Sequence, residues 1–163
     1  MSGALLEVRN LKVEFPGRRG TLLALDDVSF EISAGEILGV VGESGAGKSL
    51  TGAAIIGLLD PPGRIAAGEI RLDGRRIDNL PYEAMRKVRG RQIGAIFQDP
   101  LTSLNPLYTI GRQLMETIQA HLPISDSDAR ARAIRLLEET GIQAAAQRID
   151  QYPHQFSGGM RQR

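Results

Sequence analysis

Hydrophobic side chains occupy every second position in two stretches near the start of the chain. Residues 11–15 and residues 28–32 both alternate hydrophobic and polar positions, with a cluster of proline, arginine and glycine between them. This period of two is typical of strands with one buried face. A further hairpin is predicted over residues 69–77, because Asp73-Gly74 suits a tight turn. The N-terminal part is therefore predicted to contain an antiparallel β layer.

Two short runs are hydrophobic or glycine at every position instead. Residues 37–41 read Ile-Leu-Gly-Val-Val, and residues 93–97 read Ile-Gly-Ala-Ile-Phe. Such runs are typical of strands buried on both faces of a parallel sheet. The residues after Ser49 are spaced as a packed helix. This order of strand, loop and helix predicts the α/β class, with a parallel core sheet beside the β layer.

The period becomes helical after Pro100. Leu114, Met115, Ile118 and Leu122 fall on one helical stripe. Residues 125–128 resemble an N-cap followed by an acidic first turn, and Gly141 is placed to end that helix. The second half of the chain is therefore predicted to be a helical subdomain.

The loop between the first buried run and its helix carries the strongest chemical signal. Residues 42–49 match the phosphate-binding pattern G-x-x-x-x-G-K-[ST] in full. Glycines allow successive backbone N–H groups to converge on phosphate oxygens, and the start of a helix adds a positive dipole. We expect this segment and the residue after it to bind ATP: Gly42, Glu43, Ser44, Gly45, Ala46, Gly47, Lys48, Ser49 and Leu50. The alternative is a glycine-rich turn with an incidental lysine.

Two side chains of this loop have specific expected roles. The Lys48 ammonium is expected between the β- and γ-phosphates, where it also assists catalysis. The Ser49 hydroxyl is the expected ligand for Mg²⁺. The cofactors predicted from the sequence are therefore ATP and Mg²⁺.

Composition and charge argue against several other classes of function. The 163 residues are 42% hydrophobic, enough for one core, and 20 basic against 19 acidic side chains give a net charge of +1. We therefore predict no nucleic-acid partner. The chain has no cysteine, and its longest apolar stretch, residues 53–59, is far below the roughly 20 residues that cross a bilayer. Charged residues near the N-terminus argue against a secretory signal, which favours a cytosolic location.

Gln98 follows the second buried run directly. Ligands of open α/β sheets gather at the carboxyl ends of strands, so Gln98 is expected to face the bound phosphate. Its amide could position an attacking water or complete the Mg²⁺ shell without adding charge. The alternative is an ordinary glutamine at the end of a strand.

A second anion site is predicted near the end of the chain. Ser157 is followed by Gly158, Gly159 and helix-forming residues, so an N-cap would expose bare N–H groups at a helix start. One phosphate loop needs no second phosphate site in its own subunit. Ser157, Gly158 and Gly159 are therefore expected to contact the γ-phosphate of a nucleotide held by another subunit, although a plain turn is the alternative.

Together these elements resemble the nucleotide-binding subunit of ATP-binding cassette (ABC) transporters, and the resemblance covers essentially the whole chain. It implies a RecA-like P-loop NTPase core in which residues 42–49 are the Walker A loop, Gln98 is the Q-loop glutamine and residues 157–161 are the signature motif. Phe15 lies where the family stacks an aromatic ring on adenine, although a strand phenylalanine facing the core explains it as well. The implied division is residues 1–100 for the nucleotide-binding core and residues 101–163 for the helical subdomain.

Residues 97–106 resemble more closely the ATP subunits of dipeptide, oligopeptide and nickel importers. This resemblance implies a peripheral subunit on the cytoplasmic face of the inner membrane. Its implied partners are a second ABC ATPase subunit, identical or homologous, transmembrane permease subunits and, indirectly, a peptide-binding protein. After Gln98, Leu101, Leu104, Leu107 and Tyr108 would contact the permease, or else pack inside the helical subdomain.

The sequence departs from the family at one point. The strand that ends in Asp-Glu and the later histidine of these ATPases have no counterpart before Arg163, because His121 and His154 lie too early. We therefore expect the C-terminal part of the core to be missing and the chain to be part of a longer subunit. The alternatives are a nucleotide-binding module without turnover, a soluble ABC ATPase outside transport, and another P-loop class that uses residues 93–99 as its Mg²⁺ strand.

Overall fold

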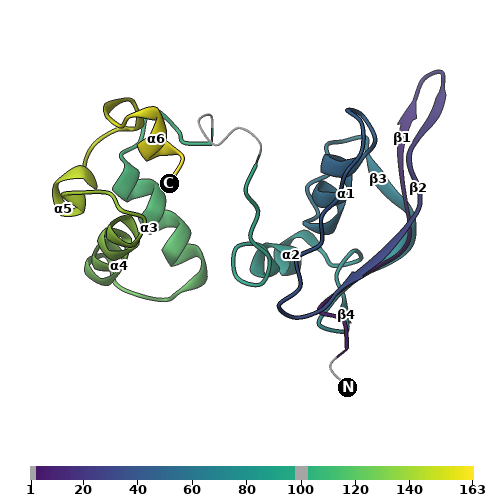
Figure 1. Cartoon of the computed structure of the whole chain (residues 1–163), viewed down its shortest axis with the longest axis horizontal. Helices are drawn as coiled ribbons and strands as arrows, with labels where there is room; N and C mark the ends of the chain where they lie inside the picture. The colour runs from purple at the N-terminus through teal and green to yellow at the C-terminus, as the bar shows by residue number, and fades with distance from the viewer. Residues whose placement is uncertain (1–2, 98–102) are drawn as a thin grey trace. The chain divides into compact units, whose positions relative to one another are not determined.

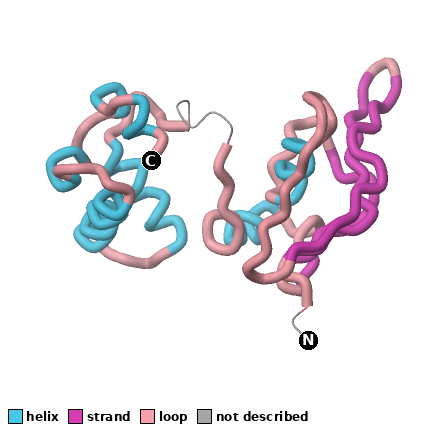
Figure 2. Tube along the Cα trace, viewed as in Figure 1, coloured by secondary structure: helices cyan, strands magenta, loops and turns pink. Residues whose placement is uncertain are grey.

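The computed structural model describes residues 3–97 and 103–163, in two compact units. The first unit ends at Arg89 and the second begins at Gly90. Strands occur in the first unit and helices dominate the second, as Figure 2 shows by colour. The predicted division near residue 100 falls outside the described residues. We describe each unit by itself.

The first unit contains a four-stranded antiparallel sheet in the order β2-β1-β3-β4 (Figure 1). The strands are β1 (Leu6–Gly17), β2 (Gly20–Ile32), β3 (Arg64–Leu72) and β4 (Arg75–Arg76). A turn at residues 18–19 joins β1 to β2, and Asp73-Gly74, both with positive φ, joins β3 to β4. The predicted antiparallel layer is confirmed, including its Asp-Gly hairpin.

One face of this sheet forms the core of the unit. The side chains of Val8, Leu11, Val13 and Ile70 are at most 1% exposed. Helices α1 (Lys48–Ile55) and α2 (Tyr82–Val88) contribute Ala54, Met85 and Val88 to the buried set. Of the positions that predict the strand over residues 11–15, Leu11 and Val13 are fully buried in the sheet.

The two expected parallel strands are not strands in this structure. Ile37 and Val41 are 96% and 93% exposed, and Ile96 is 97% exposed. No strand of the described residues pairs with residues 37–41. A strand exists only through hydrogen bonds to a neighbour. In the sheet that forms here, β1 pairs with β2 and β3, and β3 pairs with β4, all antiparallel. Hydrophobic pattern alone therefore does not form these two strands.

The second unit contains the predicted helices. They are α3 (Ile110–His121), α4 (Asp126–Glu139), α5 (Ala145–Arg148), the 3₁₀-helix η1 (Pro153–Gln155) and α6 (Gly158–Arg161). Ser125 caps α4 by accepting from the Asp128 N–H, and Gly141 follows the helix with a φ of 76°. One core cluster joins α3 and α4 to the residue after α5, with Ile118, Ala129, Ala133 and Ile149 buried.

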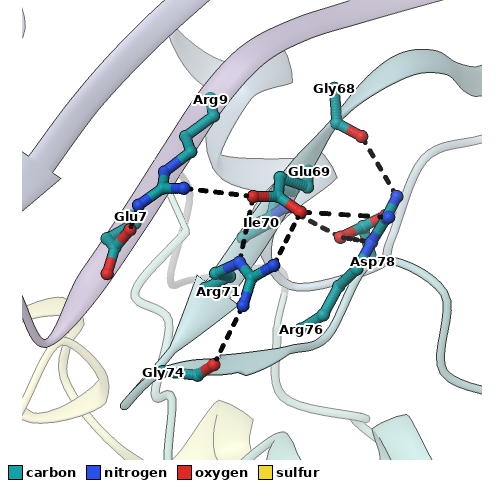
Figure 3. Close-up of polar contacts among 9 residues, drawn as sticks. All are labelled: Glu7, Arg9, Gly68, Glu69, Ile70, Arg71, Gly74, Arg76 and Asp78. Atoms are coloured by element: carbon teal, nitrogen blue, oxygen red, sulfur yellow. Dashed lines mark hydrogen bonds and ion pairs between the residues drawn. The ribbon is translucent and has the colours of Figure 1, made fainter.

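A network of arginine and acidic side chains ties β1, β3 and β4 together (Figure 3). Glu69 of β3 accepts from Arg71 at 2.9 Å and lies 3.5 Å from Arg9 of β1. Asp78, after β4, accepts from the Ile70 backbone N–H at 2.7 Å and from Arg76 at 2.8 Å. Burial opposes the charge of Asp78, yet these donors outweigh it and hold its pKa below the ordinary 3.8.

Replacement of Asp78 by asparagine is expected to lower the free energy of unfolding at neutral pH. The pKa of Asp78 is lower in the folded protein than in the unfolded chain, where it is about 4. The ionised carboxylate therefore stabilises the fold fully above that unfolded pKa, and this stabilisation is lost as the pH falls through the lower pKa of the folded state. Chemical denaturation at about pH 7 and about pH 3 should show a smaller pH dependence in D78N than in the original protein. D73N is the matched control, because asparagine also accepts the positive φ of this turn residue. If the pH dependence of D78N equals that of the original protein, the ionised Asp78 carboxylate does not contribute to stability as inferred.

Candidate nucleotide-binding site

The phosphate-binding pattern lies in the loop that leads into α1. Gly45 and Gly47 adopt φ values of 84° and 88°, which residues with a side chain rarely adopt. Gly47 is the N-cap of α1, no side chain caps the helix, and its first turn has no acidic residue. The first N–H groups of the helix and the positive end of its dipole are therefore available to an anion.

Lys48 reaches back across this loop. Its Nζ donates to the Gly42 carbonyl at 2.7 Å and to the Glu43 carbonyl at 2.6 Å. The Ala46 N–H also donates to the Glu43 carbonyl at 3.2 Å, which closes the turn. The loop is thus held around the ammonium, and a positive charge lies beside the free helix start.

Leu25 of β2 fixes this loop to the sheet. A Cβ atom built on Gly47 would lie 2.4 Å from the Leu25 Cδ2, and Leu25 itself is 5% exposed. Leu25 pairs with Val13 across the β1-β2 hairpin, so both side chains point to the same face. The loop therefore touches the inner face of the sheet. Only the position of Leu25 in the fold reveals this role, because its residue type is common on any strand.

Phe15 lies on that same face. It follows Val13 by two positions on β1, and side chains two apart on a strand point to the same side. The ring is partly buried, and its edge approaches the backbone of Gly63. The structure thus brings the predicted aromatic ring to the face that contacts the phosphate loop. Phe15 as a whole is partly exposed.

Ser157, Gly158 and Gly159 lie in the second unit. The Ser157 hydroxyl accepts from the Met160 N–H at 3.3 Å, which confirms the predicted N-cap of α6. Ser157 and Gly159 are exposed, and no side chain covers the two glycines closely. This helix start is therefore accessible from outside. Gln98 lies outside the described residues.

The loop after residue 103 has an ordered shape. The Gln113 side chain donates to the carbonyls of Asn105 and Tyr108, both at 3.0 Å, and accepts from the Asn105 N–H at 2.9 Å. Leu104 packs against the cluster of Ile110, Ile142 and Phe156, so it belongs to the core of the unit. Leu107 is 78% exposed and Tyr108 36% exposed. Leu101, the remaining residue of this set, is outside the described residues.

Comparison with known proteins places this arrangement in a family. The family model described as "ABC transporter" matches residues 25–163, which include the phosphate loop and the Ser157 helix start. The chain belongs to the ABC transporter family. A dimeric structure of the ATP-binding cassette MJ0796 bound to ADP and Pi has a TM-score of 0.79 at 25% identity, covering 96% of this chain and 65% of that one. The fold is therefore that of an ABC ATPase cassette.

Curated relatives are similar over nearly the whole chain. The dipeptide transport ATP-binding protein DppD of Escherichia coli K12 is 46% identical over 98% of this chain and 49% of its own length. The oligopeptide transport ATP-binding proteins OppD of Escherichia coli K12 and Bacillus subtilis 168 are 48% and 47% identical over 98% of this chain, and 47% and 45% of theirs. The chain thus spans about half the length of the curated relatives it matches. None of the helices in its described part has the length and hydropathy to cross a bilayer.

Proposed function

We propose that this chain is the ATP-binding, energy-coupling part of an ABC importer that carries dipeptides or oligopeptides. The observation that carries the proposal is the phosphate loop at the start of α1, which combines an accessible helix N-terminus with an ammonium and no nearby carboxylate in the first turn. The names of the similar DppD and OppD proteins support the substrate class. In this proposal the loop residues 42–50 bind the triphosphate of ATP.

The proposal also assigns residues to the base and to the metal. Phe15 would stack on adenine, while Lys48 would leave the Gly42 and Glu43 carbonyls and contact the β- and γ-phosphates. Among residues 3–97 and 103–163, no group of three histidine or acidic side chains could hold a metal ion. Mg²⁺ in nucleotide sites is held by a few protein oxygens together with the nucleotide phosphates. Ser49 is the proposed ligand, with Gln98 as a second, and bound Mg²⁺ would neutralise phosphate charge.

The proposed chemistry is hydrolysis of the γ-phosphate in the complete subunit. Gln98 would hold the attacking water through its amide oxygen, which accepts a hydrogen bond without carrying charge. Lys48 would keep the terminal phosphate oriented and stabilise charge that develops on it. Both roles concern residues of this chain, and catalysis would need further residues from the rest of the subunit.

The accessible helix start at Ser157 supports a second phosphate contact, made to a nucleotide that another subunit binds. Ser157, Gly158 and Gly159 would face the γ-phosphate bound by a partner ATPase subunit, identical or homologous, in a head-to-tail dimer. The similar MJ0796 cassette was solved as a dimer bound to ADP and Pi. ATP would hold the two subunits together in this arrangement, and hydrolysis would let them separate.

The ordered loop at residues 105–108 supports a permease contact. Gln113 holds this loop while Leu107 and Tyr108 remain exposed, so it presents hydrophobic side chains on a fixed backbone. We propose that it contacts a transmembrane permease subunit, in which case the chain would lie at the cytoplasmic face of the inner membrane. A peptide-binding protein would act through the permease. No nucleic acid is part of this proposal.

The dimer is tested with Ser157→Ala in the full-length gene product. Loss of a hydrogen bond to a charged phosphate is expected to raise the ATP concentration needed for dimerisation about tenfold. Light scattering at increasing MgATP measures this change. Ser125→Ala is the matched control, because it removes the N-cap of α4 in the same unit. Equal dimerisation curves for the two variants would reject the proposed role of Ser157.

A further inference from the structure

The segment between α1 and β3 passes directly beneath the ring of Phe15. A Cβ atom built on Gly63 would lie 2.6 Å from the Phe15 Cε1, 2.8 Å from its Cζ and 2.8 Å from the Asp60 carbonyl oxygen. The φ of Gly63 is not in the left-handed region, so backbone strain does not require glycine here. The close approach of the ring and of the Asp60 carbonyl requires a glycine at this position.

Hydrogen bonds on both sides hold Gly63 in this place. The Gly63 N–H donates to the Asp60 carbonyl at 2.8 Å, which closes the turn before β3. The next residue, Arg64, donates through Nε to Glu14 at 2.7 Å, and its second nitrogen lies 2.6 Å from the same oxygen. Glu14 precedes Phe15 on β1. The ion pair therefore joins the residue after Gly63 to the residue before the ring.

The strand register explains why ring and glycine meet. Val13 pairs with Ile65 and Glu14 pairs with Arg64 in the antiparallel β1-β3 ladder. Continuing this register by one residue brings Gly63 opposite Phe15. Directly opposite residues hold their Cβ atoms only about 4.5–5.5 Å apart. A residue without a Cβ lets the aromatic ring lie over the backbone instead of standing away from it.

We propose that Gly63 is a positioning residue that sets the tilt of the Phe15 ring and so the recognition of the nucleotide base. The inference rests on the proposed ATP site, where Phe15 stacks on adenine. A Cβ atom at position 63 would displace the ring edge from its place over the backbone, and with it the surface on which the base is proposed to stack. The triphosphate contacts lie on a different segment, at residues 42–50, and would remain in place. A substitution at Gly63 would therefore weaken binding of the base and leave binding of the phosphates unchanged.

The test compares Gly63→Ala with the original full-length protein by titration calorimetry. Two probes are used: MgATP, and magnesium tripolyphosphate, which has no base. Base stacking on an aromatic ring contributes enough that G63A is expected to raise the dissociation constant of MgATP about tenfold. The dissociation constant of tripolyphosphate is expected to stay the same within about twofold, because the phosphate loop is intact.

Controls separate this inference from the function on which it rests. Gly52→Ala makes the same change in size in α1, where a Cβ atom would meet nothing within 4 Å. Combining G63A with Phe15→Ala should produce no further loss of MgATP affinity beyond F15A alone, because the displaced ring is already absent. Failure of the original protein to bind MgATP would reject the proposed function itself. Two results would overturn the positioning role of Gly63 without rejecting the ATP site. One is MgATP binding by G63A with the original affinity, and the other is an equal loss of affinity for MgATP and for tripolyphosphate.

Discussion

Replacement of Lys48 by alanine is expected to raise the dissociation constant of MgATP about a hundredfold or more. The Lys48 ammonium is the one cation of the phosphate loop at residues 42–49. A charged donor to phosphate oxygens contributes more than a neutral hydrogen bond, and no other side chain of the loop carries the same charge. The effect of this change on binding should therefore exceed that of the other substitutions considered above.

The fold should tolerate the same change. Lys48 Nζ donates to the carbonyls of Gly42 and Glu43, and both of these residues are exposed. Water can replace the ammonium at these two oxygens, so K48A leaves no buried acceptor without a donor. The free energy of unfolding is expected to stay within about 1 kcal/mol of the original value.

Calorimetry and chemical denaturation on the full-length protein measure the two quantities separately. Lys87→Ala removes the same charge from an exposed position on α2 and serves as the matched control. K87A is expected to bind MgATP as the original protein does. Binding of MgATP by K48A with unchanged affinity would refute the phosphate role of this loop.

Features that depend on nearby residues were predictable from the sequence. The caps at Ser125 and Ser157 and the Asp73-Gly74 turn all form as expected. In each, the deciding hydrogen bond or φ value involves residues within about one helical turn. Residue type and spacing are then sufficient. The positive φ values of Gly45 and Gly47 are predictable for the same reason, since they depend on glycine at these positions.

Features that depend on distant residues were not predictable in this way. Residues 37–41 have the composition of a buried strand, yet Ile37 and Val41 are almost fully exposed because no described strand pairs with them. The contacts of Leu25 with Gly47 and of Phe15 with Gly63 join separate segments of the chain. Packing of the loop on the sheet brings Leu25 to Gly47, and the strand register brings Phe15 to Gly63. Neither contact can be recognised from the residue types alone.

These two distant contacts give the candidate site its organisation. Leu25 holds the phosphate loop and Gly63 supports the aromatic ring, both on the inner face of one antiparallel sheet. The segment from α1 to β3 begins at the phosphate loop and ends under the ring. In the proposed function, base and triphosphate would thus be positioned by the same sheet.

The second large effect is expected for Gly47→Ala, and Gly45→Ala provides its matched control. Both glycines have nearly the same positive φ, 88° and 84°, so both substitutions cost the strain of a left-handed alanine, about 1–2 kcal/mol. A Cβ atom at Gly45 would meet nothing within 4 Å, whereas one at Gly47 would lie 2.4 Å from the Leu25 Cδ2. Overpacking against Leu25 is therefore expected to make G47A less stable than G45A by a further 1–3 kcal/mol, roughly.

Removing the Leu25 side chain tests whether it is the source of the clash with a Cβ atom at position 47. Leu25 is 5% exposed and lies opposite the fully buried Val13, so its methyl group has little room to move away. In a Leu25→Ala background the space beneath position 47 is open, and G47A should then destabilise the protein no more than G45A does. Chemical denaturation of the single and double variants gives the coupling between positions 25 and 47. If G47A and G45A lower the free energy of unfolding equally in the original background, the loop is not held to the sheet through Leu25.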